Sequence, residues 1–441
     1  MLWDTRSIAH LVRTRFLTSV TLSDLASLAL AMMSASIVVF STALPWRASL
    51  PKPGDSVWAM LAFLFFSMVA SSIFTEQMSG PGVPRPTYGR MLAILFGTVF
   101  LTAGLIVLFR NVYFSRAFLA FTSAIWLVPA TAHRVLRRQR PWTERIGVIT
   151  KEKQLADDLH DSDHANVVWV LAPSFDGPID LPERDVTIAI DLRSVLSENV
   201  AQYLSSCDVA GYAIRPFSSI YGDHTGRVPL IHVAEGWEIS APLLDVARWL
   251  PGKRFVDVTL TVLFAPIWVP LGLLVAAYVK LTDPGFSIFR QERVGLNGEA
   301  FTMFKFRTMH LDAELDGPQF ARKNDPRLIR GGAFLRRSRL DEIPQLWNVL
   351  KGDMTIVGPR AEQVPFVDAF RREIPFYDHR HMVRPGITGW AQVNYRYADD
   401  QAETIEKLTY DLYYIKHMSP VMDLRIFSMS IWTVLTGAGA R

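Results

Sequence analysis

The chain has 441 residues, of which 50% are hydrophobic and only 20% are charged. Such a composition is unusual for a soluble protein, so it favours a membrane protein with two or three domains. The net charge of +4 suits an anionic membrane surface, phosphate groups or nucleic acid, but no nucleic-acid-binding motif accompanies it. The single cysteine, Cys207, excludes an intramolecular disulfide framework and a cysteine zinc cluster.

Four long apolar stretches lie near the start of the chain, at residues 22–46, 56–75, 90–109 and 117–136. Each is close to the ~20 residues that a helix needs to cross a bilayer, so we predict four transmembrane helices within residues 1–140. Arginines lie on both outer sides of this set: Arg6, Arg13 and Arg15 before it, and Arg134, Arg137, Arg138 and Arg140 after it. Because cationic flanks stay in the cytoplasm, and four crossings return the chain to its starting side, both ends are expected to be cytoplasmic.

Residues 141–250 are predicted to form a small α/β domain. Strand-like segments at 145–150, 167–171, 186–191 and 212–217 are separated by helical segments at 151–160 and 195–206. Helical crossovers imply parallel strands. The turn after the first strand lacks the glycines that let a backbone approach a pyrophosphate. We therefore expect a degenerate Rossmann-like domain with a structural role or a role in homo-oligomer formation.

A fifth apolar stretch, residues 255–281, contains Pro266 and Pro270. Proline removes a backbone donor and clashes with the preceding turn, so a straight helix is not expected. Cations lie on both sides of the stretch: Lys253 and Arg254 before it, and Lys280, Arg290 and Arg293 after it. This distribution favours a re-entrant helix that enters and leaves the same leaflet, with a plain kinked span as the alternative.

Asp341 and Glu342 are adjacent carboxylates within a basic region. Such pairs are common on protein surfaces, so this one gains weight only from the cations near it. Arginine holds phosphate oxygens through two parallel hydrogen bonds, which makes these cations candidates for binding a diphosphate. The candidates are Lys305, Arg307, Arg336 and Arg337. The alternative is a solvated basic face or a patch that binds anionic lipids.

Pro344 suits the first turn of a helix that continues to residue 350, because its missing N–H is tolerated there. Asp341 and Glu342 would then precede a helix N-terminus, where free backbone donors favour anions. Three residues are expected to anchor this helix in the core: Leu346, Trp347 and Leu350.

A carboxylate that attacks a phosphate meets like charge. One unit pair at ~4 Å costs on the order of 4 kcal/mol at an effective dielectric of ~20. A cation must therefore intervene, and Mg²⁺ held by Asp341 and a diphosphate would serve. Glu342 would act as a base or as a second polar contact.

Two further arginines lie on tight turns, Arg360 after Gly358-Pro359 and Arg384 before Pro385-Gly386. Both are candidates for binding the substrate, and a salt bridge within the fold is the alternative. The nearby run of residues 378–381 (DHRH) lacks the spacing of metal ligands, so we expect a structural role for it.

Residues 337–360 (RSRLDEIPQLWNVLKGDMTIVGPR) and 383–394 (VRPGITGWAQVN) resemble the bacterial sugar transferase family. These enzymes are the monotopic phosphoglycosyl transferases, or polyprenyl-phosphate sugar-1-phosphate transferases. The resemblance is specific over residues 251–441, which would form a mainly helical catalytic domain. Over residues 1–250 only the architecture, four spans and an α/β domain, is similar to the large members of the family.

The resemblance implies that Asp341 attacks the sugar-bearing phosphate of a UDP-sugar, expels UMP, and passes the phosphosugar to undecaprenyl phosphate. Glu342 matches the second residue of the family's carboxylate pair, and the family uses magnesium. A UDP-hexose such as UDP-glucose or UDP-galactose is the expected donor, with a UDP-N-acetylhexosamine as the alternative. The product would start an exopolysaccharide, capsule or O-antigen repeat unit at the cytoplasmic face of the bacterial inner membrane.

The chain departs from the family pattern at two positions. Ala265 stands where a serine normally precedes the helix-breaking proline, here Pro266, so a local hydrogen bond is missing. Arg339 stands where many members have a small residue, which adds a cation beside the carboxylates.

Two interpretations compete with an enzyme. A membrane scaffold would use the acidic pair and the arginines for packing or lipid contacts, and a nucleic-acid-binding protein would use the basic residues alone. The C-terminal segments 410–414 and 420–435 mix aromatic, aliphatic and charged residues. They are compatible with helices that lie flat on a membrane or with buried core helices.

Overall fold

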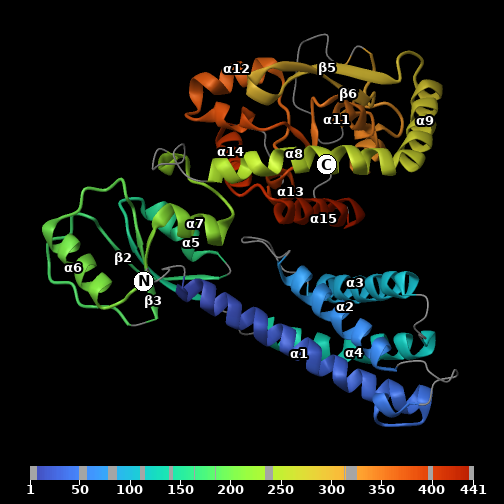
Figure 1. Ribbon diagram of the computed structural model, residues 1–441. Helices are drawn as coiled ribbons and strands as arrows, with labels where there is room; N and C mark the ends of the chain where they lie inside the picture. The colour runs from blue at the N-terminus through green and yellow to red at the C-terminus, as the bar shows by residue number, and fades with distance from the viewer. Residues whose placement is uncertain are drawn as a thin grey trace. The chain divides into compact units, whose positions relative to one another are not determined.

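The computed structural model describes residues 7–48, 57–77, 87–109, 115–138, 143–162, 164–183, 185–233, 242–311, 313, 325–395 and 401–436. The chain divides into two compact units, Met1–Thr225 and Gly226–Arg441, and each is described by itself (Figure 1). The finer division into domains at residues 1–140, 141–250 and 251–441 stays a prediction.

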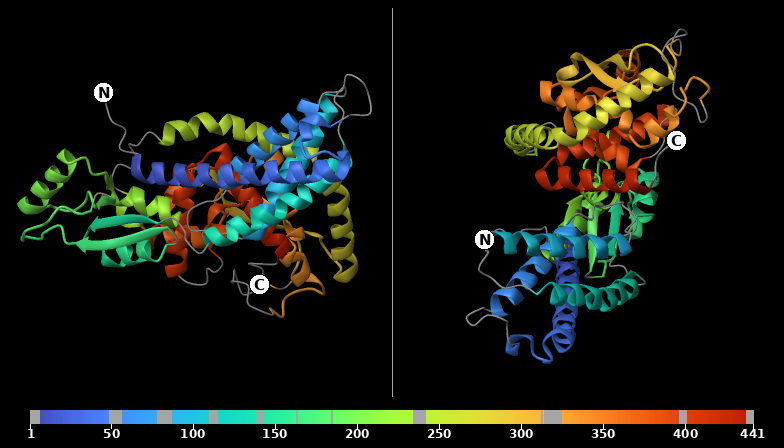
Figure 2. Two further views of the ribbon diagram at one scale, coloured as in Figure 1. Left: turned by 90° about the horizontal axis from the view of Figure 1, so that it is seen from below. Right: turned by 90° about the vertical axis from the view of Figure 1, so that its right-hand side faces the viewer.

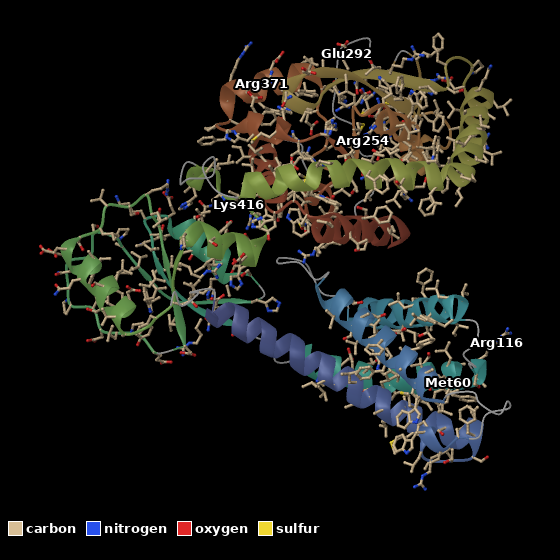
Figure 3. The ribbon with its side chains drawn as sticks, viewed as in Figure 1. Met60, Arg116, Arg254, Glu292, Arg371 and Lys416 are labelled. Atoms are coloured by element: carbon tan, nitrogen blue, oxygen red, sulfur yellow. The ribbon has the colours of Figure 1, made fainter. Side chains whose placement is uncertain are left out.

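Four helices cover the four predicted apolar segments. They are α1 (Ser7–Phe40), α2 (Val57–Gln77), α3 (Thr87–Leu108) and α4 (Arg116–Arg138), with a short 3-10 helix, Pro45–Arg47, after α1. Helices α1 and α4 pack along each other, as do α2 and α3 (Figure 2). Met60 of α2, labelled in Figure 3, is fully buried, as are Ile94 of α3 and Trp126 of α4.

Among the described residues, two helices are long and apolar enough to cross a membrane, Leu22–Arg47 and Ala265–Thr282. Helices α2 and α3 contain shorter apolar stretches, Val57–Ile73 and Ile94–Leu108. The last turns of α4 carry arginines, which interrupts its apolar run. The predicted four-span membrane region is therefore not confirmed, although all four helices are present.

Residues 143–225 contain a four-stranded sheet of order β2-β1-β3-β4, and its strands are parallel, as predicted. Its strands are β1 (Glu144–Ile149), β2 (Ala165–Leu171), β3 (Val186–Ile190) and β4 (Ile214–Pro216). Helices α5 (Lys153–His160) and α7 (Phe217–Thr225) pack on one face, and α6 (Glu198–Val209) packs on the other. The crossover helices explain why the strands are parallel.

Two α-helices of the second unit meet at a sharp break, α8 (Pro242–Leu263) and α9 (Ala265–Thr282) (Figure 1). Phe264 is non-helical, and the chain turns there, two residues before Pro266. The indole N–H of Trp268 donates to the Thr261 carbonyl at 2.8 Å, across the break. This bond satisfies a carbonyl that the break leaves without its helical partner. The predicted kink is confirmed, and re-entry into one leaflet stays a prediction.

The rest of this unit surrounds two short sheets. Strands β5 (Ile288–Val294) and β6 (Ala300–Phe306) are antiparallel, whereas β7 (Thr355–Val357) and β8 (Gly386–Thr388) are parallel. The helices are α10 (Gly332–Arg337), α11 (Gln345–Lys351), α12 (Val364–Glu373), α13 (Trp390–Asn394), α14 (Gln401–Lys416) and α15 (Pro420–Thr436). Short 3-10 helices occupy Leu230–His232, Leu296–Gly298, Leu340–Glu342 and Tyr377–Met382.

Helix α15 has two different faces. Met422 and Ile426 are buried, and the helix packs against β7 and β8. Val421, Leu424 and Ile431 are exposed on its other side. One face of the helix therefore belongs to the core, as in the interpretation of segment 420–435 as a core helix, and the other is an apolar surface. Contact of that surface with a membrane stays a prediction.

The turns before β8 and after β7 approach each other so closely that only glycine is compatible. A Cβ atom on Gly386 would lie 2.1 Å from the Gly358 nitrogen, and one on Gly389 would lie 2.2 Å from the Gly358 oxygen. This contact holds the turn that precedes Arg360 against the turn that follows Arg384.

Candidate active site

Asp341 and Glu342 lie in the 3-10 helix η4 (Leu340–Glu342) and are only 7% and 6% exposed. Arg339, the residue immediately before η4, adopts a left-handed backbone conformation with φ 58°. This conformation is costly for a residue with a side chain, and here it forms the tight turn from α10 into η4. The turn places two adjacent carboxylates inside the protein.

Helix α11 follows the carboxylate pair, with Pro344 at its N-terminal boundary, close to the predicted start. The predicted core face of this helix is wrong at Trp347, which is 56% exposed. Asn348 is fully buried instead, and its side chain bonds to the Phe304 N–H at 3.1 Å and the Thr302 carbonyl at 2.7 Å. These bonds attach α11 to β6, so a polar residue does the anchoring.

Three cations surround one oxygen of Glu342. Its Oε1 atom lies 3.0 Å from Arg360, 3.2 Å from Arg339 and 3.7 Å from Lys305. They reach it from three separate segments: the strand β6, the turn before η4 and the loop after β7. Together with the two carboxylates they leave a formal excess of one positive charge, which suits an anionic ligand.

Asp341 has a different environment. Its Oδ1 atom is buried and has no hydrogen-bond partner among the residues that the structure describes. A buried unpaired oxygen of this kind is costly unless a ligand or ion satisfies it. The two neighbouring carboxylates are therefore unequal, since one is saturated by cations and the other is available.

The pKa values of the two carboxylates shift in opposite directions from their ordinary values. Burial, and then the charge of Glu342, raise the pKa of Asp341 above its ordinary value. Burial also acts to raise the pKa of Glu342, but Arg360, Lys305 and Arg339 outweigh it and lower that pKa. Glu342 is therefore ionised at neutral pH and is a poor proton acceptor, so holding the cations suits it better than the predicted role as a base.

The structure brings only some of the predicted cations to the pair. Lys305 and Arg360 contact Glu342 directly. Arg336 donates to the Thr308 hydroxyl at 2.9 Å, and its charge offsets part of the rise in the pKa of Asp341. Arg337 is exposed at the end of α10.

Arg307 and Arg384 have other partners. Arg307 is buried, pairs with Asp283 and donates to the Phe286 carbonyl at 2.8 Å. Arg384 donates to the Gly352 carbonyl at 2.9 Å, at the carboxyl end of α11. Arg307 is therefore not part of a solvated basic face, which was its alternative. The contact of Arg384 lies within the fold, as in its alternative, but is a hydrogen bond to a carbonyl and not the expected salt bridge.

Arg254 was not a predicted site residue, yet it also binds the carboxyl end of α11. From α8 (Figure 3) its guanidinium donates to the carbonyls of Val349 and Leu350, the latter at 2.8 Å. A cation here complements the negative end of the helix that follows the carboxylates.

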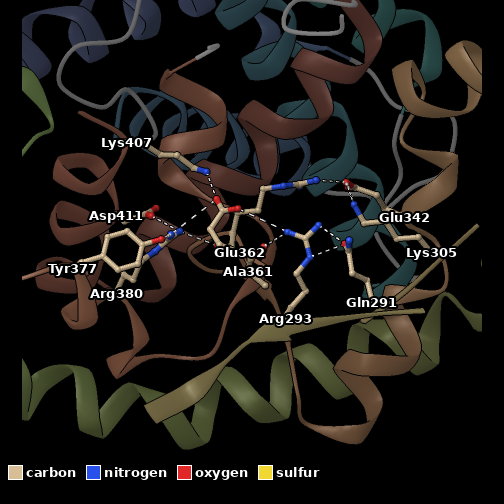
Figure 4. Close-up of polar contacts among 11 residues, drawn as sticks. Gln291, Arg293, Lys305, Glu342, Ala361, Glu362, Tyr377, Arg380, Lys407 and Asp411 are labelled. Atoms are coloured by element: carbon tan, nitrogen blue, oxygen red, sulfur yellow. Dashed lines mark hydrogen bonds and ion pairs between the residues drawn. The ribbon is translucent and has the colours of Figure 1, made fainter. Parts of the chain in front are cut away.

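A buried ionic network extends from the site into the unit (Figure 4). Arg380 is bonded to Asp411 at 2.9 Å, and Glu362 is paired with Lys407. The sequence predicted a structural role for the run that contains Arg380, whereas Glu362 and Asp411 were missed. A lone aspartate within the apolar run of residues 410–415 was the available signal, because charged residues are rarely buried without a partner.

Comparison with known proteins assigns the family. A model of the family described as bacterial sugar transferase matches residues 248–437. A UDP-glucose:undecaprenyl-phosphate glucose-1-phosphate transferase from Caulobacter vibrioides is 41% identical over 42% of this chain, which covers 70% of that protein. The chain belongs to the bacterial sugar transferase family.

Other members of this family are similar over different lengths. A UDP-N-acetylgalactosamine-undecaprenyl-phosphate N-acetylgalactosaminephosphotransferase from Aeromonas hydrophila is 42% identical over 63% of this chain and 65% of its own length. The exopolysaccharide production protein PSS of Rhizobium leguminosarum is 38% identical over 42% of this chain and 95% of its own length. The chain spans 65% of the length of the Aeromonas relative and 42 to 44% of the length of two other curated relatives.

Proposed function

We propose that this protein transfers a sugar 1-phosphate from a UDP-sugar to undecaprenyl phosphate and releases UMP. The observation that carries the proposal is the unequal carboxylate pair. Asp341 has a buried oxygen without a hydrogen-bond partner among the described residues, whereas three cations converge on the neighbouring Glu342. Family membership supplies the reaction class, because relatives are named for this transfer.

In the first step an oxygen of Asp341 attacks the sugar-bearing phosphorus of the donor. The new oxygen–phosphorus bond replaces the bond to the bridging oxygen, and UMP leaves with that oxygen and its electron pair. The phosphosugar is then an acyl phosphate ester on Asp341. The raised pKa of Asp341 reflects a carboxylate that is poorly solvated, which suits a nucleophile.

In the second step a phosphate oxygen of undecaprenyl phosphate attacks the same phosphorus. The bond to Asp341 breaks, and the carboxylate is regenerated. The product is undecaprenyl diphosphate sugar, the first intermediate of a surface polysaccharide such as an exopolysaccharide, capsule or O-antigen. Lys305, Arg339 and Arg360, which Glu342 holds in place, stabilise negative charge on the diphosphate through both steps.

The residues present are compatible with magnesium. The described residues contain no group of three or more His, Cys, Asp or Glu side chains placed to hold a metal ion. Mg²⁺ nevertheless binds often through one or two carboxylates plus substrate phosphates, and the unpaired Asp341 oxygen provides such a ligand. Bound there, the ion would screen the repulsion between carboxylate and diphosphate and stabilise the departing phosphate.

A membrane location fits the lipid acceptor. The helix Ala265–Thr282 is long and apolar enough to enter a bilayer and lies in the same unit as the carboxylate pair. We propose that α8 and α9 form a re-entrant hairpin at the cytoplasmic face of the bacterial inner membrane, and that α1 to α4 cross it.

The proposal is tested with purified full-length protein, Mg²⁺, undecaprenyl phosphate and a panel of UDP-sugars, by following UMP release. The panel includes UDP-glucose, UDP-galactose and UDP-N-acetylgalactosamine, because relatives carry both glucose and N-acetylgalactosamine names. Asp341→Asn should lower turnover on the order of 10³-fold or more, since the nucleophile is removed at constant size. Mass spectrometry without acceptor should detect a phosphosugar on Asp341 in the unsubstituted protein.

A matched control is Glu144→Gln, which also converts a buried carboxylate to an amide but lies in the first unit. Its turnover should match that of the unsubstituted protein. Normal turnover by Asp341→Asn, or a donor panel without any UMP release, would overturn the proposed reaction.

A further inference from the structure

The main chain at Arg360 is fixed by bonds from elsewhere in its unit. The Pro359 carbonyl accepts from the Gly386 N–H at 2.8 Å. The Arg360 carbonyl accepts from the Arg380 guanidinium, also at 2.8 Å. The first bond comes from the first residue of β8 and the second from the 3-10 helix Tyr377–Met382.

The next two carbonyls are fixed in the same way from β5. The Ala361 carbonyl accepts from the Arg293 guanidinium at 3.0 Å. The Glu362 carbonyl accepts from the Val294 N–H at 3.0 Å. Four consecutive carbonyls thus have external donors, so the segment has little freedom to move.

Arg293 and Arg380 are donors of this set that also join the buried ionic network, Arg293 at 3.8 Å from Glu362. Arg380 is the more deeply buried of the two. It is 4% exposed, and it bonds to the Tyr377 hydroxyl at 2.7 Å and to Asp411 on α14 at 2.9 Å (Figure 4). Its planar guanidinium reaches all three partners at once, which a lysine ammonium does not reproduce. Asp411 compensates a buried charge that would otherwise be costly.

The chain of contacts ends at the carboxylate pair. The Arg360 carbonyl accepts from the Arg380 guanidinium at 2.8 Å, and the Arg360 guanidinium donates to Glu342 at 3.0 Å. A long arginine side chain points accurately only if its backbone is held, and small displacements of charged groups are costly in catalysis.

We propose that Arg380, held by Asp411, is a positioning residue that fixes the main chain of Arg360 and thereby sets the Arg360 guanidinium against Glu342. This inference rests on the proposed sugar-phosphate transfer. Arg380 itself contacts neither carboxylate of the pair in the described structure, so its effect passes through Arg360.

A double-mutant cycle distinguishes this role from general stabilisation. Asp411→Asn should lower kcat by ~10-fold while the donor KM changes less, because misplacement acts on the transition state. In an Arg360→Lys background the same substitution should lower kcat by less than ~2-fold, since the guanidinium it positions is already gone. An equal factor in both backgrounds would show a merely structural role and overturn the proposal.

Two further variants protect the test against misfolding. Tyr377→Phe removes a single acceptor from Arg380 and should show a smaller effect with the same dependence on Arg360. Glu144→Gln removes a buried carboxylate in the first unit, far in the sequence from Arg360, and should change kcat in neither background. Thermal unfolding of every variant identifies those that lose their fold.

A measurement without turnover separates this inference from the proposed function. Phenylglyoxal modifies accessible arginines, and mass spectrometry of the peptide that contains Arg360 gives its rate. Asp411→Asn should raise that rate several-fold, whereas Glu144→Gln should leave it unchanged. An unchanged rate in Asp411→Asn sinks the positioning role, and an absence of transfer with a raised rate sinks only the proposed reaction.

Discussion

At the scale of a single residue, the charge of Lys305 makes the site sensitive to pH. Burial, and then the charge of Arg360, lower the pKa of Lys305 from 10.5 to about 8. The ammonium is therefore charged below about pH 8 and becomes neutral as the pH rises through that value. Loss of this proton removes one of the three cations that surround Glu342.

We expect kcat/KM for the donor to fall as the pH rises above about 8, because a neutral Lys305 no longer attracts the diphosphate. Lys305→Arg should move this limb to higher pH, since a guanidinium stays protonated. The measurement is the donor kcat/KM between pH 6 and 10 for both proteins. An identical basic limb in Lys305→Arg would assign the titration to another group.

Sequence patterns identified which residues carry charge near the site, but not which groups those residues contact. The adjacent Asp341 and Glu342 are evident in the sequence, and two of the six predicted cations, Lys305 and Arg360, contact Glu342. Arg307 and Arg384 have equally favourable positions in the sequence but bind other groups. Whether these residues bind the donor stays a prediction.

The pair of strands β7 and β8 determines where Arg360 lies at the scale of elements. Their flanking turns are in backbone contact, so Gly386 has no room for a side chain. Gly-Pro and Pro-Gly sequences predicted tight turns here, but the contact between the two turns depends on packing.

Gly386→Ala should destabilise the protein by about 1–3 kcal/mol, because the added methyl group must displace main-chain atoms. It should also lower turnover, since Arg360 follows the displaced turn. The control is Gly104→Ala in α3, where an added Cβ meets no atom within 4 Å and helix propensity improves. Unfolding temperatures of both variants test this, and equal values would contradict the close approach.

The break between α8 and α9 forms without the serine that normally precedes the proline in this family. Pro266 prevents a continuous helix, as the sequence predicted. With Ala265 in the preceding position, the Trp268 indole supplies the hydrogen bond across the break. No local sequence pattern indicated the Trp268 indole as the donor, because it reaches the Thr261 carbonyl only when the chain turns at Phe264.

At the scale of the whole molecule, the arrangement in the membrane makes a distinct prediction. The cationic flanks predict that residues on both sides of the first four helices are cytoplasmic. A re-entrant hairpin keeps the transferase unit on that side, whereas a full crossing places it outside.

The single cysteine makes this testable in a Cys207→Ser background. Single cysteines are introduced at three exposed positions: Arg116, Ser205 and Ala369. In intact cells whose outer membrane has been permeabilised, an impermeant maleimide should label Arg116→Cys, which lies at the start of α4, between the third and fourth proposed spans. Ser205→Cys and Ala369→Cys should react only after lysis, and labelling of Ala369→Cys in intact cells would show that α8 and α9 cross the bilayer.

The sequence by itself determined the local features of this protein: the apolar helices, the parallel α/β sheet, the broken helix and the adjacent carboxylates of the family motif. These follow from periodicity, from proline and glycine, and from short motifs, all of which act over a few residues. The tertiary structure decided which cations meet Glu342, why one oxygen of Asp341 has no partner among the described residues, and how Arg380 reaches Arg360. These features join residues far apart in the chain, and the packing of whole elements determines which of many similar charges come together.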